Sequence, residues 1–217
     1  MKNKHYLVFV LGFMAMLFVF YGCALMKPGI KKTKGIGESP AMTVLEKIPN
    51  IPQPDWTTSS KDYWTQNGNV YTSGSAKKYS NLKTALDEAE NFAMAKLVKH
   101  TKETMLAEFR ETMALQKYDA KTGEYVTDTF SIVVSTMKIS GAWIKESYSE
   151  KIKETSKGNE RIIYRSWVLV ELTRPVYESN IQQALSNLKT VVKTNKNVKK
   201  LVDSINNAIK GKSQKQR

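Results

Sequence analysis

The chain is short of the residues that build disulfides, metal sites and nucleophilic active sites. Among its 217 residues there are two histidines and a single cysteine, Cys23. One cysteine excludes an internal disulfide framework and a Cys-rich zinc site. The sequence also lacks a glycine-rich phosphate loop and a Gly-x-Ser-x-Gly elbow. His100 lies in the middle of a long helical pattern, where a structural role is expected. We therefore expect no cofactor, no metal and no enzyme activity.

Proline is scarce outside one segment near the N-terminus. Five of the six prolines, from Pro28 to Pro54, lie there with several glycines and little apolar periodicity. Such a composition predicts an extended, mobile tether. We assign residues 23–53 to this tether and expect the folded domain to begin near Pro54-Asp55-Trp56.

Only one long uncharged apolar run is present, from Tyr6 to Met26. It follows Lys2 and Lys4, which is the arrangement of a secretory signal. The run reaches Gly22-Cys23, a small residue directly before the only cysteine, and this resembles the lipobox of bacterial lipoproteins. The resemblance implies that residues 1–22 are a signal peptide, cut before Cys23, and that Cys23 carries lipid on its thiol and acyl on its amino group, palmitate included.

An uncleaved inner-membrane signal anchor is the alternative for this run, which is long enough to span a bilayer. Four lysines follow the run between residues 27 and 34, against two before it. The positive-inside tendency therefore opposes translocation of the C-terminal side. Both readings attach the chain to a membrane.

The remaining pattern predicts an α+β fold. Residues 69–76 favour a strand, and Ser80 or Asn81 begins a helix whose apolar stripe runs through Leu82, Leu86, Ala89, Ala93 and Leu97 toward Met113. Residues 118–127 suggest a loop, and residues 128–138 fit either a helix or a strand. Residues 140–153 and 161–172 alternate as a hairpin around a turn at 155–160. Two helices, or one bent helix, follow Pro175. We expect a small antiparallel sheet covered on one face by the long helix.

Several short motifs, in order, resemble the Lpp-twenty-like family of twenty-kilodalton outer-membrane antigen lipoproteins. They are Pro54-Asp55-Trp56, Gly74-Ser75-Ala76, the alanines at 85, 89, 93 and 95, Ser140-Gly141-Ala142 and Arg174-Pro175. The resemblance covers about residues 50–190 and implies a dodecin-like fold. It also implies a lipid-anchored outer-membrane protein, in some members a structural part of flagellar assemblies. It carries no catalytic residues, and it favours a helix for residues 128–137.

Excess positive charge is concentrated at the C-terminus. The formal net charge is +14, and residues 189–217 hold nine basic residues and one acidic residue. We assign 54–190 to the α+β domain and 191–217 to a basic helical tail. The tail is either solvated or binds an anionic lipid or cell-wall polymer; pairing as a coiled coil through Leu185, Leu188 and Val192 is a third reading. The candidate contact residues are Lys196, Lys199, Lys200, Lys210, Lys212, Lys215 and Arg217.

The sequence thus predicts a non-enzymatic envelope lipoprotein with a structural or assembly role. Its expected partners are the membrane through Cys23 and further copies of itself or other envelope proteins through the edge of the hairpin. Because an exported protein meets little nucleic acid, we expect no nucleic-acid partner. A binding module that contacts anionic lipid or wall polymer through its C-terminus is the alternative function.

Overall fold

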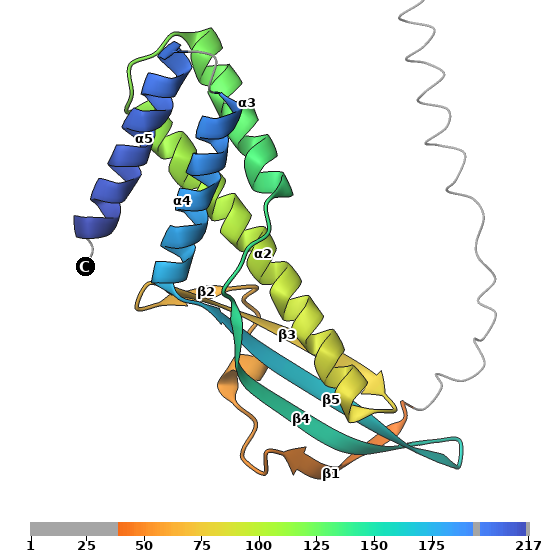
Figure 1. Ribbon diagram of the computed structural model, residues 1–217. Helices are drawn as coiled ribbons and strands as arrows, with labels where there is room; N and C mark the ends of the chain where they lie inside the picture. Colours follow the sequence, from red (N-terminus) through yellow and green to blue (C-terminus); the bar gives the residue numbers. More distant parts are fainter. Residues whose placement is uncertain (1–38, 193–195, 216–217) are drawn as a thin grey trace, which may run out of the picture. The chain divides into compact units, whose positions relative to one another are not determined.

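The computed structural model describes residues 39–192 and 196–215, with side chains as far as Gly211 (Figure 1). The chain divides into two units, Met1–Ser39 and Pro40–Arg217. The predicted signal peptide, Cys23 and the first part of the tether lie outside the described residues. Every described core residue lies between Val70 and Ile209. Residues 40–217 therefore contain their own hydrophobic cores and are expected to fold without residues 1–39.

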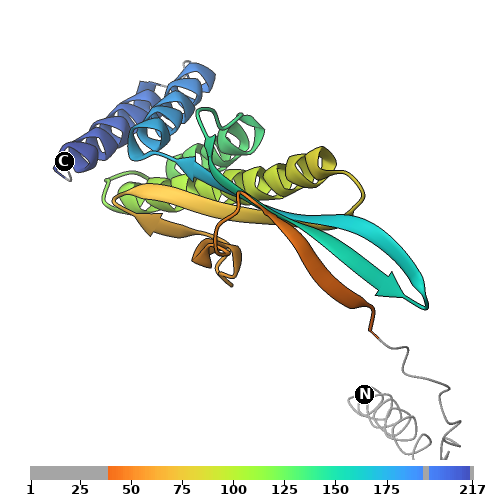
Figure 2. The same ribbon diagram turned by 90° about the horizontal axis from the view of Figure 1, so that it is seen from below.

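The fold is α+β, as predicted. One antiparallel sheet has the order β1-β4-β5-β3-β2. Its strands are β1 (Ala41–Ile48), β2 (Trp64–Gln66), β3 (Asn69–Tyr79), β4 (Trp143–Ser156) and β5 (Asn159–Leu172). The helices are the short 3-10 turn η1 (Asp55–Thr57), α2 (Leu82–Ala114), α3 (Ala120–Thr136), α4 (Arg174–Val191) and α5 (Lys196–Lys215). Helix α2 covers one face of the sheet, and η1 lies against the other face (Figure 2).

The centre of the sheet is the β4–β5 hairpin. Its strands pair from Trp143↔Glu171 to Ser156↔Asn159. Lys157 and Gly158 form the two-residue loop, both with positive φ (51° and 79°), which is the geometry of a type I′ hairpin turn. The prediction of a hairpin with a turn at residues 155–160 is confirmed.

Helix α2 approaches the sheet through its small residues. Asn81 caps it by accepting a hydrogen bond from the backbone N–H of Thr84. Ala85, Ala89 and Ala93 are fully buried against the sheet. Opposite them stands Gly74 of β3, where a Cβ would lie 2.0 Å from the carbonyl oxygen of Ala89. The glycine and the alanines together allow the backbones of β3 and α2 to come unusually close.

A second hydrophobic core lies where the C-terminal half of α2 meets α3, α4 and α5 (Figure 1). The rings of Phe109 and Phe130 stack there with centroids 3.9 Å apart. Helix α5 contributes an amphipathic face of buried residues: Val198, Leu201, Val202, Ile205 and Ile209. The predicted C-terminal helix therefore forms, and in the structure it packs into the core of the folded unit.

The loop predicted for residues 118–127 is wrong, because α3 already begins at Ala120. Asp119 caps the helix by accepting hydrogen bonds from the N–H and hydroxyl of Thr122. The ambiguous element at 128–138 is mostly the rest of this helix. Phe130, Val133 and Val134 are buried whereas Ile132 is 65% exposed. Burial with helical spacing outweighs the β-propensity of the Ile-Val-Val run.

The boundary of the tether also needs correction, because residues 41–48 form strand β1 and not an extended linker. This strand pairs with β4 from Ala41↔Thr155 to Ile48↔Ser149. Pro40 and Pro49 flank the strand. The proline content of the segment therefore predicted a tether although the residues between the two prolines are mostly apolar. Consequently β4 is not a free edge, and the hairpin edge expected to mediate self-association is covered by β1 on one side and β3 on the other.

The two faces of β5 are both buried from Ser166 to Leu172. Alternating strands of a hairpin usually bury one face only, and Trp167, Leu169 and Glu171 lie on the face opposite to Val168, Val170 and Leu172. In the structure Trp167, Leu169 and Glu171 are 7%, 4% and 4% exposed. As a central strand, β5 has neighbours on both sides and is crossed by α2 on one face.

Candidate functional site: buried carboxylates of the sheet and the basic helical end

Strands β4 and β5 carry three buried glutamates, the only buried carboxylates among the described residues. Glu150, Glu154 and Glu171 are 6%, 2% and 4% exposed. A buried carboxylate is costly unless cations and hydrogen-bond donors surround it. Each of the three glutamates has such partners. The position of these partners determines whether the carboxylate could serve as a general acid or base.

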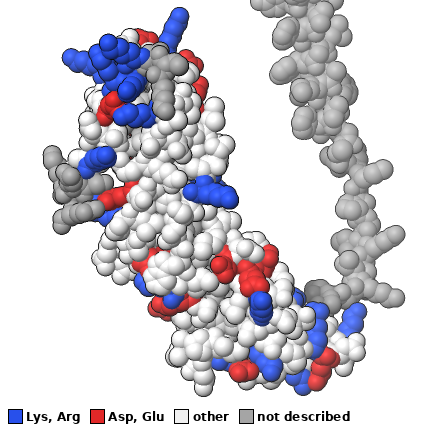
Figure 3. Space-filling view, in the orientation of Figure 1, with Lys and Arg blue, Asp and Glu red and all other residues white. Residues whose placement is uncertain are grey.

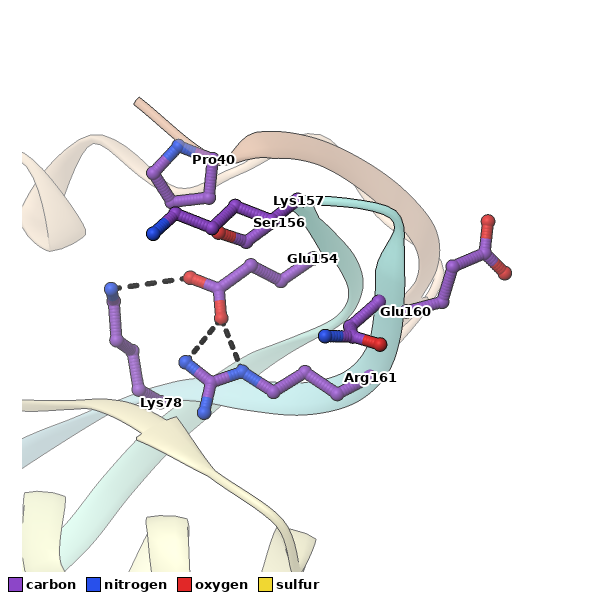
Figure 4. Close-up of a pocket in the computed structure, with 8 residues that line it drawn as sticks. Pro40, Lys78, Glu154, Ser156, Lys157, Glu160 and Arg161 are labelled. Carbon is purple, nitrogen blue, oxygen red and sulfur yellow. Dashed lines mark hydrogen bonds and ion pairs between the residues drawn. The ribbon is translucent and has the colours of Figure 1, made fainter. Parts of the chain in front are cut away.

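Glu154 lies in a cleft of about 370 Å³ at the far end of the hairpin (Figure 4). Arg161, across the hairpin, donates from its Nε to Oε2 and adds an ion pair from its terminal nitrogen. The ammonium of Lys78 lies 3.2 Å from Oε1. Hydrogen bonding to Arg161 and then Lys78 lowers the pKa of Glu154 below its ordinary value. The carboxylate is therefore held ionised and clamped by two cations, which suits a structural cluster and not a general base.

Glu171 is engaged in the same way at the other end of β5. Its Oε1 accepts hydrogen bonds from Tyr71 and from Asn69, each at 2.7 Å. Lys145 lies 3.7 Å from Oε2 and donates to the Tyr71 hydroxyl oxygen at 3.2 Å. That hydrogen bond raises the pKa of Lys145, with the charge of Glu171 adding to it. A lysine kept protonated in this way is not an activated amine nucleophile.

Glu150 completes the set on β4. It accepts a hydrogen bond from Tyr148 and pairs with Arg165 at 3.7 Å. The guanidinium of Arg165 also lies over the ring of Trp167, with its carbon 5.8 Å from the ring centroid. All three buried carboxylates thus stabilise the sheet through neighbouring cations.

His100, the lone histidine of the predicted domain, lies on helix α2. Its ring stacks on Tyr63 with centroids 3.3 Å apart. Burial lowers the pKa of His100, and the nearby charge of Glu103 opposes that shift. Across the part of the chain that the structure describes, no cluster of three or more His, Cys, Asp or Glu side chains could hold a metal ion.

Three of the four tryptophans make separate contacts in or beside the sheet. Trp56 of η1 donates its indole N–H to Glu146 at 2.8 Å. Trp64 stacks on Tyr71 at 5.8 Å, and Trp167 is buried against Tyr148. These contacts serve packing and hydrogen bonding, whereas the fourth tryptophan, Trp143 on β4, is 49% exposed.

The structure divides the predicted anionic-contact residues into separate groups. Lys196, Lys199 and Lys200 are exposed on the first turns of α5. Lys210 is exposed ten or more residues further along the helix, about 15–20 Å away at 1.5 Å per residue. The side chains of Lys212, Lys215 and Arg217 lie outside those that the structure describes.

Two residues that the sequence reading missed join the first group. Lys117 and Lys121, on the α2–α3 turn and the start of α3, are exposed at the same end of the helices. The turn and α5 are linked by a hydrogen bond from Ser204 to Gln116 at 2.7 Å. Lys117 and Lys200 line one cleft of about 310 Å³ there. Their separation of 83 positions along the sequence conceals this proximity.

Comparison with protein-family models, with curated proteins and with solved structures gives no match. The resemblance to the Lpp-twenty-like family therefore stays a prediction from motifs. Within the described residues, no helix has the length and apolarity needed to cross a bilayer. The Tyr6–Met26 run lies outside those residues.

Proposed function

We propose that this chain is a lipid-anchored protein of the bacterial cell envelope, at the outer membrane, with a structural or assembly role and no enzymatic one. The observation that carries the proposal is the position of its single cysteine. Cys23 directly follows a small residue at the end of a basic-then-apolar N-terminal segment, where a lipoprotein needs it. Seventeen positions later Pro40 begins the folded unit. The resemblance to the Lpp-twenty-like lipoproteins supports the same proposal.

The chemistry of the described residues is compatible with this role. The buried glutamates Glu150, Glu154 and Glu171 are held by Arg and Lys neighbours. Catalysis by a carboxylate or an amine needs a pKa moved toward the working pH. The pKa of Glu154 and that of Lys145 are moved away from neutrality instead.

Metabolic labelling with a fatty-acid analogue tests the anchor. We expect label on the wild-type protein and none on Cys23→Ala, because the thiol is the acceptor. The Cys23→Ala protein should also keep its uncut apolar segment and migrate as a longer chain. Equal labelling of both proteins would contradict the proposal, and an unlabelled wild type would favour the signal-anchor alternative.

For the assembly role, β1 replaces the hairpin as the surface that pairs with a second copy. It is the longer of the two edge strands, and Met42, Val44 and Leu45 are 43–50% exposed along it. Glu46 and Lys47 are neighbours in the sequence. If two β1 strands pair antiparallel with the centre of the pairing between these two residues, each Glu46 lies opposite Lys47 of the other copy. This self-complementary charge makes a second copy the partner that the edge fits.

Light scattering of residues 40–217 during size-exclusion chromatography tests this pairing. We expect a dimer or larger assembly that dissociates in Val44→Lys/Leu45→Lys, because lysines in place of exposed apolar side chains make an edge strand unfavourable for pairing with another chain. Lys153→Ala, whose strand position is already paired, is the control and should leave the assembly unchanged. A wild-type fragment that is monomeric at all concentrations would refute pairing through β1.

A further inference from the structure

The end of the helices where the α2–α3 turn meets α5 combines positive charge with exposed apolar side chains. We call it the basic helical end and define it by Leu115, Lys117, Tyr118, Lys121, Lys196, Lys199 and Lys200. Buried Leu201 and Val202 and the hydrogen bond from Ser204 hold α5 against this turn. Figure 3 shows Lys and Arg side chains (blue) gathered at this end of the helices, with a few Asp and Glu side chains (red) among them.

The charge of the basic helical end is poorly balanced by its surroundings. All five lysines are exposed, and in the described residues none of them forms an ion pair. Asp119 and Glu124 lie near Lys117 and Lys121 along the chain, and Asp203 lies three positions after Lys200. Asp119 is engaged in capping α3, where the hydrogen bond from the Thr122 hydroxyl lowers its pKa. By contrast Lys189, further along the α4–α5 pair, is neutralised by Asp203 at 2.6 Å.

The apolar members of this end point to lipid as the partner. Leu115 is 72% exposed and Tyr118 is 40% exposed. Leu115 is the most exposed large hydrophobic side chain among the described residues. At a membrane interface a tyrosine ring sits at headgroup level and a leucine enters the acyl boundary, while lysines meet anionic headgroups. A soluble polyanion would use the lysines and leave Leu115 in water.

We propose that the basic helical end docks on a bilayer rich in anionic phospholipid. This contact is separate from the anchor at Cys23, because it uses residues of the folded unit alone. It goes beyond the proposed function, and either can fail without the other. The protein would then hold a membrane at two points, one covalent and one electrostatic.

Co-sedimentation of residues 40–217 with vesicles tests the proposal without any contribution from the anchor. The vesicles contain phosphatidylcholine alone or with roughly one-third phosphatidylglycerol, an anionic lipid. We expect binding only to the anionic vesicles, weakening as salt is raised. Charge reversal by Lys117→Glu/Lys199→Glu/Lys200→Glu should weaken it at least tenfold.

A matched control reverses three exposed lysines elsewhere, by Lys83→Glu/Lys99→Glu/Lys138→Glu. It changes net charge equally and should keep most of the binding. Leu115→Ser should weaken binding by a factor that salt does not alter, because this contribution is apolar. Circular dichroism of each variant confirms that the helices are retained.

Three outcomes would overturn the proposal. They are a wild-type fragment that ignores anionic vesicles, an equal loss in both triple variants, and binding to purified wall polymer only. If the fragment does not fold, a second experiment uses the full chain, attached to neutral vesicles through its N-terminal anchor. These vesicles are mixed with labelled anionic vesicles. Capture of the labelled vesicles by the wild type but not by the triple variant then supports the proposal, and equal capture contradicts it.

Discussion

The close approach of β3 to α2 yields the sharpest stability prediction. A Cβ at Gly74 would lie 2.0 Å from the carbonyl oxygen and 3.1 Å from the carbonyl carbon of Ala89, and 2.5 Å from the backbone nitrogen of Ala93. Contacts under 3.0 Å are essentially never seen for Cβ atoms, so Gly74→Ala must move strand and helix apart by about 1 Å. All three obstacles are backbone atoms, which cannot rotate away as a side chain could.

Two hydrogen bonds make this separation more costly. Thr72 donates its hydroxyl to the Ala93 carbonyl at 2.9 Å, and Lys96 donates to the Ser73 carbonyl at 3.2 Å. Overpacking costs about 1–3 kcal/mol, and each stretched hydrogen bond contributes about 1 kcal/mol. We expect Gly74→Ala to lower the free energy of unfolding by roughly 3–5 kcal/mol. For a domain of this size that corresponds to a fall in Tm of roughly 6–20 °C.

Thermal unfolding followed by circular dichroism measures this effect. Gly211→Ala is the matched control, because no atom lies within 4 Å of its added Cβ and the position is helical. Alanine favours a helix over glycine by about 0.5–1 kcal/mol, so the control should melt at the wild-type temperature or slightly higher. A Gly74→Ala protein that melts within about 2 °C of wild type would refute the packing account.

Two further predictions concern the second core and the clamped carboxylate. Phe130→Ala should lower the free energy of unfolding in urea by about 3–5 kcal/mol, because the fully buried ring stacks on Phe109; a loss below about 1 kcal/mol would contradict its core role. Glu154→Gln should lower the urea midpoint at neutral pH. The pKa of Glu154 is lower in the folded than in the unfolded chain, so its stabilisation is complete above the unfolded pKa and is lost as the pH falls through the folded one. The gap between the two proteins should therefore close in acid, and a gap independent of pH would count against the ionic clamp.

The parts of the fold that the sequence predicted are those with a strong local signal. The β-favouring run at residues 69–76 identified β3, Asn81 and the alanine spacing identified α2, and the alternation of the hairpin identified β4 and β5. Asp119 also carried a local signal for α3, since it precedes Thr122 by the three positions of a cap. The turn-favouring residues around it, including Gly123, led to the prediction of a loop instead.

Other features depend on contacts that no local pattern contains. Strand β1 has no buried residue of its own and gains its structure from pairing with β4. The burial of Trp167 and Leu169 depends on β5 being central in the sheet. The basic helical end joins Lys117 to Lys200 only after α5 has packed on the α2–α3 turn. These features depend on pairing and packing between residues far apart in the sequence. Composition and periodicity are local properties and could not predict them.

The most direct test of the envelope-lipoprotein proposal is the intact mass of the native protein extracted from membranes. The account predicts a chain that begins at Cys23 and carries the added mass of three acyl chains with their glycerol. A chain that begins at Met1 without lipid would contradict it.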